Sequence, residues 1–281
     1  MPELPEVETT RRGLLPLVGK VVKSVTIRHP TLRWPIPQHL LQTLPSQSLI
    51  GLTRRAKYIL CDFGNETSSK GVLILHLGMS GRIQLLECNY PPEKHDHFDI
   101  EFEDGQVLRL RDPRRFGAVL WIKSDNLGSN KYKHPLLNSL GPEPLEEGFN
   151  AKYLQKALSK KTLAIKNAIM DGHVVVGVGN IYASESLFRS RINPEKAANK
   201  LSIKQCEKLV VDIKSTLNDA LSAGGSSLRD FFGTDGNPGY FQQEYFVYGR
   251  TGMPCKVCSN PIKCIRLGQR STFYCDKCQK R

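Results

Sequence analysis

Two closely spaced cysteine pairs near the C-terminus constrain the fold more than any other feature of this sequence. Cys255 and Cys258 form the first pair, Cys275 and Cys278 form the second, and sixteen residues separate the pairs. Each pair can hold one edge of a metal ion, and a β-hairpin between them would bring the two edges together. Four thiolates in a tetrahedron are the ligand set of structural zinc and leave no open coordination position. The spacing therefore predicts one structural Zn²⁺ on a hairpin, with an iron centre as the less favoured alternative.

Four further cysteines lie outside this spacing, and we expect them to pack as small hydrophobic residues. They are Cys61, Cys88, Cys206 and Cys264. The sequence has no apolar run close to the roughly 20 residues that a membrane-spanning helix needs. Its N-terminus also lacks the basic segment and following apolar segment of a signal peptide. The expected compartment is therefore the cytoplasm, where thiols stay reduced.

The chain carries a large excess of positive charge, with a formal net charge of +13 over 281 residues. Residues 250–281 hold eight Lys or Arg residues and one acid, which is a net charge of +7 in this segment alone. Such an excess predicts a polyanionic partner. Because the segment contains the ordered cysteine pairs, with Arg266 and Arg270 between them, we favour phosphate binding over a solvated charged tail.

The pattern of apolar residues predicts a β-rich first part and a helical second part. Residues 20–27 and 71–75 have the alternation and β-branched content of strands, and residues 20–122 are expected to form a β-sandwich or barrel. Pro5 and Gly13 suit the start and end of a short helix that precedes the strands.

Helical patterns follow at 153–158, 163–170, 181–188 and 203–221, the last of which opens with a capping box. The glycine-rich link at 171–179 joins the second and third helices. This pair resembles a helix-turn-helix with an extra turn, whose backbone N–H groups can approach a phosphate.

The start of the chain is a candidate for covalent amine catalysis. Pro2 would carry the free amino terminus after removal of the initiator Met, and its secondary amine can attack an aldehyde-like carbon to form an iminium. An α-amino group titrates at about pH 8, so that much more of it than of a lysine is nucleophilic at pH 7. Two carboxylates, Glu3 and Glu6, lie within one helical turn of it. A Met-Pro start alone is equally typical of an ordinary N-terminus.

Six motifs together resemble the bacterial formamidopyrimidine-DNA glycosylases. They are Met-Pro-Glu-Leu-Pro-Glu-Val-Glu-Thr at 1–9, His-Leu-Gly-Met-Ser-Gly at 76–81, Asp-Pro-Arg-Arg-Phe-Gly at 112–117, Val-Gly-Val-Gly-Asn-Ile-Tyr-Ala at 176–183, Asp-Gly-Asn-Pro-Gly-Tyr-Phe at 235–241 and the four-cysteine hairpin. They occur in the family's order and cover essentially the whole chain. The resemblance implies an α+β multidomain fold made of an N-terminal β-sandwich, a helix-two-turn-helix module and a C-terminal four-Cys zinc-finger β-hairpin.

The same resemblance divides the chain into four segments. We expect a catalytic β-sandwich domain at 1–133, an interdomain linker rich in Pro, Gly and Glu at 134–149, a DNA-binding helical domain at 150–244 and the zinc finger at 245–281. Within the helical domain, a glycine-rich loop near 226–240 resembles the family segment that closes over the flipped base. The implied partner is double-stranded DNA with oxidised bases or abasic sites, bound by a monomer.

The chemistry that the resemblance implies is removal of oxidised purines, such as 8-oxoguanine and formamidopyrimidines, followed by strand cleavage. A base inside a duplex is inaccessible, so that the nucleotide must first flip out. The Pro2 nitrogen then attacks C1′ and displaces the base, and β,δ-elimination cuts the strand. Glu3 is the implied general acid/base. Glu6 either supports Glu3 or only caps the helix, and we give the two interpretations comparable weight.

Other matched positions imply contacts with the DNA backbone. Lys57 matches a family lysine that binds the phosphate near the lesion, and His76, Asn180 and Arg270 match further phosphate contacts. Taken singly, Lys57 could be an exposed strand lysine and His76 a packed core residue. Lys166 lies near the family's lysine-rich segment, and the sequence does not single out which lysine in 160–166 acts near the lesion.

Met79, Arg114 and Phe116 match residues that the family inserts into the base stack, and we call them the wedge residues. Two apolar groups would fill the space left by the flipped nucleotide, and the guanidinium would reach the orphaned base. Core packing is the alternative for Met79, but the flanking Gly78 and Gly81 favour a turn.

Two other functions are alternatives. The sister enzyme endonuclease VIII prefers oxidised pyrimidines, but it usually has Gly at position 4, where this chain has Leu4, and a different wedge in place of 112–117. A non-catalytic zinc-finger DNA-binding protein of the same fold is the second alternative, against which Pro2, Glu3 and Lys57 argue.

Overall fold

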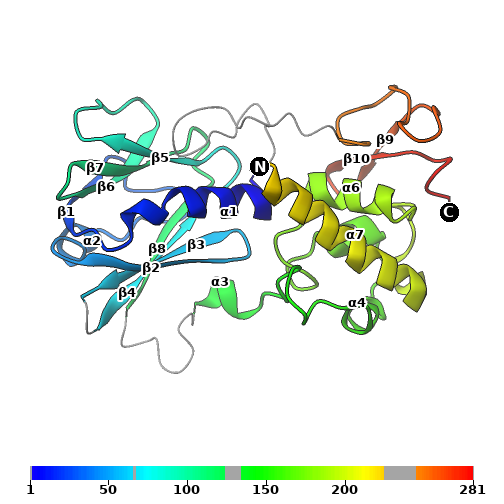
Figure 1. Cartoon of the computed structure of the whole chain (residues 1–281), viewed down its shortest axis with the longest axis horizontal. Helices are drawn as coiled ribbons and strands as arrows, with labels where there is room; N and C mark the ends of the chain where they lie inside the picture. The colour runs from blue at the N-terminus through cyan, green and yellow to red at the C-terminus, as the bar shows by residue number, and fades with distance from the viewer. Residues whose placement is uncertain (1, 66–67, 124–133, 225–244, 281) are drawn as a thin grey trace. The chain divides into compact units, whose positions relative to one another are not determined.

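In the computed structural model the chain forms two compact units (Figure 1). Among the described residues, the first unit contains 2–138 and residue 224, and the second contains 139–223 and 245–280. The described residues are 2–65, 68–123, 134–224 and 245–280. The predicted loop near 226–240 lies outside these residues, and the predicted domain boundaries at 133, 149 and 244 stay predictions.

The first unit is a β-sandwich that follows a short helix. Its elements are α1 (Leu4–Gly13), the 3-10 turn η1 (Leu15–Leu17), β1 (Val22–Ile27), α2 (Leu40–Thr43), β2 (Ser48–Arg55), β3 (Tyr58–Gly64), β4 (Ser69–His76), β5 (Arg82–Glu87), β6 (Asp96–Phe102), β7 (Gln106–Arg111), β8 (Ala118–Lys123) and α3 (Pro135–Asn138). One antiparallel sheet has the order β1-β6-β7-β5 and the other has the order β2-β3-β4-β8. The predicted sandwich is therefore confirmed.

A single core cluster joins the two sheets. Ile59 and Phe63 on β3 and Phe98 and Ile100 on β6 belong to it, all at most 1% exposed. Alternate residues of each strand point to the same face of a sheet, so that these positions line the two inner faces. Val7 of α1 belongs to the same cluster. The helix predicted between Pro5 and Gly13 is thus confirmed and is packed by its apolar side.

The second unit combines helices with the cysteine-bearing hairpin. Its elements are α4 (Ala151–Leu158), α5 (Ile165–Ile169), α6 (Asn180–Arg189), the 3-10 turn η3 (Ala198–Lys200), α7 (Ile203–Ser222), β9 (Lys263–Leu267) and β10 (Arg270–Tyr274). α7 packs against α4 and α6, and β10 packs against α6. All four predicted helices are confirmed, α5 being shorter than expected. The capping box of Ser202 and Gln205 at the start of α7 is also present.

The segment predicted as a linker contains structure of its own. It begins with α3, and beyond it Gly141 N–H donates to the Gly172 carbonyl and Val176 N–H to the Pro142 carbonyl, at 2.8 and 3.2 Å. These bonds hold Gly141 and Pro142 against the glycine-rich link within the second unit. Among the described residues, no helix is both long and apolar enough to cross a membrane.

The expectation that all four remaining cysteines are packed is wrong for two of them. Cys61 and Cys206 are buried, as expected, but Cys88 and Cys264 are exposed. Cys88 follows the end of β5, and Cys264 lies on the two-stranded sheet β10-β9. A cysteine at such a position has no second layer of structure to cover it.

Candidate functional site

The first turn of α1 holds two buried carboxylates beside Pro2. Glu3 is the N-cap residue, and both Glu3 and Glu6 are 1% exposed, whereas Pro2 is half-buried. The Glu3 backbone N–H donates to the Glu6 carboxylate at 2.8 Å, and the Glu3 carboxylate accepts from the Glu6 backbone N–H in return. This reciprocal pairing is a capping box. The capping role of Glu6 is therefore confirmed, and it fixes the backbone next to Pro2.

Helix α1 runs alongside β2 in a register that brings its first turn toward the β2–β3 turn. The Arg11 guanidinium donates to the Leu52 carbonyl at 3.3 Å, and one helical turn earlier Glu8 pairs with Arg54 at 3.3 Å. A helix rises roughly 1.5 Å per residue and a strand roughly 3.3 Å. The first helical turn of α1, which contains Glu6, therefore lies level with the β2–β3 turn that contains Lys57.

Lys57 lies in a tight turn next to His76. The turn between β2 and β3 consists of Ala56 and Lys57, and Ala56 has a φ of 54°, which is uncommon for a residue with a side chain. Tyr58, the next residue, pairs with His76 across β3 and β4, and their rings lie 4.8 Å apart. Lys57 and His76 are nineteen residues apart in the sequence, and the pairing of Tyr58 with His76 brings them close together.

His76 is a neutral hydrogen-bond donor at this position. Its Nδ1 accepts from the Gly78 backbone N–H at 3.1 Å, so that the ring proton lies on Nε2. Burial, followed by the charges of Lys57 and Arg33, lowers the pKa of His76 to about 4. A phosphate can therefore receive an uncharged N–H from His76.

The lowered pKa of His76 predicts a loss of stability in acid. The unfolded chain takes up a proton near pH 6.5, whereas the folded chain does so only at about pH 4. The free energy of unfolding should therefore fall as the pH drops from 6.5 to 4, with a contribution from this residue of up to about 1.4 kcal/mol per pH unit. His76→Gln should remove that contribution, measured by denaturant unfolding between pH 7 and 4. An unchanged pH dependence in the variant would contradict the prediction.

The wedge residues lie on two loops of the first unit. Met79 is half-buried in a turn between β4 and β5, as Gly78 and Gly81 predict, so that the turn interpretation is confirmed. Arg114 and Phe116 are exposed on the loop between β7 and β8. The Arg114 guanidinium lies over the Phe116 ring, 4.8 Å from its centre, and Phe116 remains 46% exposed. An apolar ring held at the surface is available to insert between bases.

The four predicted cysteines form one metal site. Their sulfur atoms all lie within 4.8 Å of one another, with Cys255 and Cys278 at 3.9 Å and Cys258 and Cys275 at 3.5 Å. Zinc–sulfur bonds of about 2.3 Å in a tetrahedron set the sulfurs about 3.8 Å apart. The donor set and its spacing therefore fit Zn²⁺, and these cysteines hold a structural zinc. Cys264 lies outside the group.

The metal site is anchored to the helical part of the unit by two buried polar side chains, Glu185 and Gln279. Neither of them was predicted from the sequence. The Glu185 carboxylate on α6 accepts backbone N–H bonds from Phe246, Val247 and Tyr248, at 2.8 to 2.9 Å. Burial raises the pKa of Glu185, and these three donors oppose that shift. Gln279 accepts from the Cys275 N–H and donates to the Ile192 carbonyl, both at 2.9 Å.

Lys166 joins Asn180, one of the predicted phosphate contacts, to strand β10. It is fully buried, and its ammonium donates to the Asn180 side chain at 2.5 Å, the Ser271 carbonyl at 2.9 Å and the Thr272 hydroxyl at 2.7 Å. The Asn180 amide also donates to the Ser271 carbonyl, at 3.1 Å, and its second N–H suits a phosphate. Lys166 is thus part of the buried framework behind Asn180.

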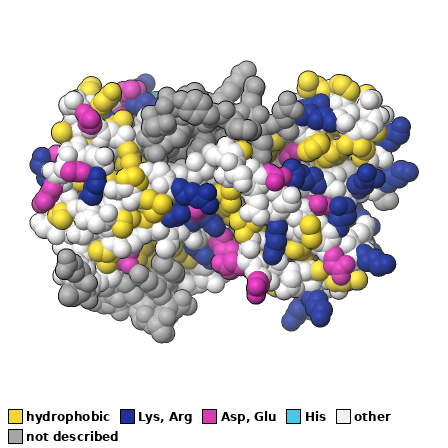
Figure 2. All heavy atoms as spheres, viewed as in Figure 1, with side chains coloured by type: hydrophobic (Ala, Val, Ile, Leu, Met, Phe, Trp, Pro, Cys, Tyr) yellow, Lys and Arg dark blue, Asp and Glu magenta, His cyan; other side chains and the backbone are white. Residues whose placement is uncertain are grey.

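Arg270 stands at the tip of the hairpin, next to this framework. The turn between β9 and β10 consists of Gly268 and Gln269, which have φ values of 48° and 61°, as a two-residue hairpin turn requires. Arg270 follows directly and is exposed. Lys and Arg side chains also spread over the surface of the unit that contains α4 and α7 in Figure 2. Both features suit contact with a polyanion.

Family models match three parts of the chain. Residues 1–119 match the formamidopyrimidine-DNA glycosylase N-terminal domain, residues 140–232 match the H2TH domain of the same family, and residues 252–281 match a zinc finger found in FPG and IleRS. Together these three matches account for most of the chain.

Full-length relatives and solved structures agree with these matches. A formamidopyrimidine-DNA glycosylase of Methylobacillus flagellatus is 61% identical over all of this chain and 97% of its own length. One of Saccharophagus degradans is 53% identical, with both chains fully covered. Lactococcus lactis Fpg in complex with abasic-site DNA superposes with a TM-score of 0.89 at 34% identity, over 99% of this chain and 100% of that one. A point mutant of the L. lactis protein in complex with Fapy-dG DNA gives 0.89 at 35% identity, with both chains fully covered. This chain therefore belongs to the formamidopyrimidine-DNA glycosylase family.

Proposed function

We propose that this base-excision-repair DNA glycosylase removes oxidised purines, such as 8-oxoguanine and formamidopyrimidines, from duplex DNA and then cuts the strand at the abasic site. Family membership over the whole chain makes it a DNA glycosylase. The observation that most supports the finer assignment is the buried pair Glu3 and Glu6 in the capping box beside Pro2. It supplies a fixed acid next to a secondary amine.

The Pro2 amine, freed by removal of Met1, is the proposed nucleophile. Its nitrogen bonds to C1′ of the flipped nucleotide as the bond from C1′ to the base breaks, and the proton that the amine gives up leaves with the base. The sugar ring then opens, its oxygen takes a proton from Glu3, and an iminium links Pro2 to the sugar. The positive end of α1 favours the neutral amine that this attack requires, whereas the neighbouring carboxylates favour the protonated form.

Strand cleavage follows from the iminium. It acidifies the C2′ proton, which Glu3 removes as a general base, and the 3′ phosphate leaves by β-elimination. A second elimination releases the 5′ phosphate. The zinc takes no part in these steps, because its four thiolate ligands leave no open position.

Phosphate contacts hold the damaged strand during these steps. In the first unit Lys57 supplies a charge and His76 an uncharged N–H, a division supported by the lowered pKa of His76. In the second unit Asn180 and Arg270 are the proposed contacts, supported by the framework around Lys166. The wedge residues then fill the stack from which the nucleotide has flipped, and Arg114 donates to the orphaned base.

A direct comparison of substrates tests this function. The purified protein should cleave a duplex with 8-oxoguanine opposite C faster than a matched duplex with an oxidised pyrimidine. The reverse order would favour the endonuclease VIII-like activity, against which Leu4 and the loop 112–117 argue. Binding to both duplexes without cleavage would identify a non-catalytic DNA-binding protein instead.

The proposed setting is the cytoplasm, where a monomer associates with the nucleoid through its DNA substrate. The net charge of +13 supports association with a polyanion of this kind.

A further inference from the structure

We propose that Asp112, through Ser80, is a positioning residue that locks the two loops carrying the wedge residues into one rigid body. The inference rests on the proposed function of the wedge residues. It concerns the turn at 78–81, which carries Met79, and the loop at 112–117, which carries Arg114 and Phe116. Asp112 itself is fully buried and is not expected to touch DNA.

The Asp112 carboxylate bridges the two loops by hydrogen bonds. One oxygen accepts from the Ser80 hydroxyl at 2.8 Å, and the other accepts from the Gly117 backbone N–H at 2.7 Å. The Ser80 oxygen in turn accepts from the Arg114 backbone N–H at 3.2 Å. Bonds to a buried carboxylate are stronger than those between neutral groups. Both ends of the 112–117 loop are thereby tied to one buried acid.

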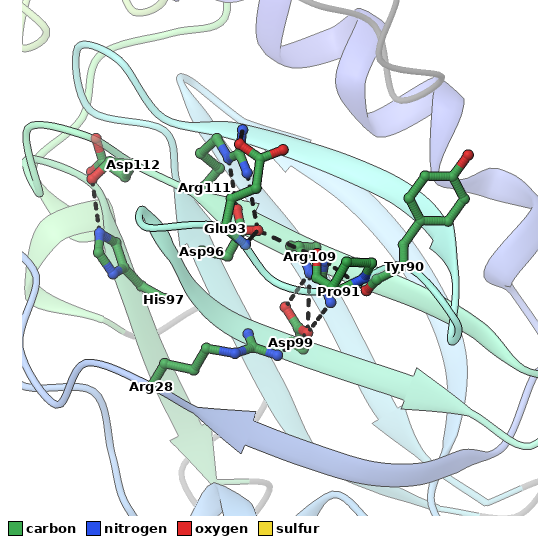
Figure 3. Close-up of polar contacts among 10 residues, drawn as sticks. All are labelled: Arg28, Tyr90, Pro91, Glu93, Asp96, His97, Asp99, Arg109, Arg111 and Asp112. Atoms are coloured by element: carbon green, nitrogen blue, oxygen red, sulfur yellow. Dashed lines mark hydrogen bonds and ion pairs between the residues drawn. The ribbon is translucent and has the colours of Figure 1, made fainter.

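The backbone of Asp112 is held from the opposite side by β6 and the segment before it. Its N–H donates to the His95 carbonyl at 3.0 Å. Its carbonyl accepts from Nε2 of His97 at 3.0 Å, as Figure 3 shows. The neighbouring Arg111 guanidinium is paired with Asp96 at 2.7 Å. The base of the loop is therefore fixed to a sheet, while its tip carries the exposed wedge side chains.

Close backbone contact leaves the two loops no room to slide. Gly78 has a φ of +62°, and a Cβ at this position would lie 2.4 Å from the Gly117 nitrogen and from the Phe116 carbonyl carbon. A Cβ on Gly117 would lie 2.7 Å from the His76 carbonyl oxygen. Within the 112–117 loop, Arg115 adopts a φ of 56°, a conformation that a non-glycine residue holds only when its surroundings enforce it.

A rigid pair of loops explains how an apolar ring can serve as a wedge. Separating two stacked bases costs free energy, and a mobile loop would add the cost of ordering itself during insertion. With Asp112 holding the backbone, Phe116 and Arg114 already have a fixed position before DNA arrives. Loss of the bridge should therefore slow the step that opens the stack and spare the later steps.

Ser80→Ala tests this role, with Ser69→Ala as a matched control. Ser69 donates to the buried Asp62 at 2.6 Å, so that it makes the same kind of bond at the start of β4, in the same unit. Both variants should lose similar thermal stability. Only Ser80→Ala also removes the bond from the Arg114 backbone N–H. It alone should slow excision of 8-oxoguanine from a duplex, by about five- to tenfold, and leave incision of a preformed abasic site within about twofold.

Two further variants distinguish failure of this inference from failure of the wedge itself. Asp112→Asn keeps the volume but leaves one acceptor oxygen for the two donors, the Ser80 hydroxyl and the Gly117 N–H. It should show the same split between excision and incision, together with a weaker preference for C opposite the lesion. Phe116→Ala reports on the wedge directly. If Phe116→Ala shows the split while Ser80→Ala behaves like Ser69→Ala, the positioning role is wrong and the wedge stands. If Phe116→Ala slows both reactions equally, both assignments are overturned.

Discussion

Protein that retains Met1 is expected to lose both base excision and strand cleavage, by at least about 10³-fold, while it still binds damaged DNA. An acylated Pro2 nitrogen is an amide without a nucleophilic lone pair, so that no iminium can form. The phosphate contacts and the wedge residues are unaffected by this change. Single-turnover cleavage of an 8-oxoguanine duplex, with binding measured on the same preparation, compares the processed and unprocessed forms.

The site of the covalent bond can be read directly. Borohydride reduction during the reaction should trap the protein on DNA, and peptide mapping should find the adduct on residue 2. An adduct on Lys57 would show that the nucleophile is misassigned.

Two variants separate the roles of the neighbouring acids. Glu3→Gln keeps the amine and should still be trapped on a preformed abasic site, but it should excise slowly for want of a proton donor. Glu6→Gln retains an oxygen that can accept from the Glu3 N–H, so that it should remain near wild-type activity if Glu6 acts only as a cap.

Local chemistry accounts for what the sequence could predict. The capping box of Ser202 and Gln205, the turn at Gly78 and the spacing of the cysteine pairs each depend on residues a few positions apart, and all three are present. The alternation in the strands likewise predicts which faces are buried, because each side chain has only two sides to choose between.

Contacts between distant residues account for what the sequence could not predict. Lys166 meets Ser271 and Thr272 more than a hundred positions away, and Glu185 caps a segment 61 to 63 positions later in the chain. Nothing in the local pattern around either residue indicates such a partner. The Ser80–Asp112 bond could be predicted only in part. Both residues lie in family motifs, at 76–81 and 112–117, but only the packing of the two loops brings them together.

Replacement of a zinc ligand is expected to have the second large effect. Cys258→Ser should lose the metal, because a serine hydroxyl is a poor zinc ligand at neutral pH. Zinc binding to small finger peptides is worth about 10–16 kcal/mol, as much as the whole stability of an ordinary domain. We therefore expect the hairpin of β9 and β10 to unfold and DNA affinity to fall, measured by metal analysis, thermal melting and a binding titration.

Matched variants show whether the zinc acts through the hairpin that carries Arg270. Cys264→Ser changes an exposed cysteine on β9 outside the metal group, and it should keep zinc, stability and affinity. Arg270→Ala should keep the zinc and the melting temperature, yet lose one phosphate contact, so that the slope of log K against log salt concentration falls by about one. Equal DNA affinity of Cys258→Ser and Cys264→Ser would contradict the prediction, because it would show that the zinc does not hold any phosphate-binding residue in position. Lys166 links β10 to Asn180. Unfolding of the hairpin on loss of zinc should therefore weaken the phosphate contact of Asn180 as well as that of Arg270. The salt slope should then fall more in Cys258→Ser than in Arg270→Ala.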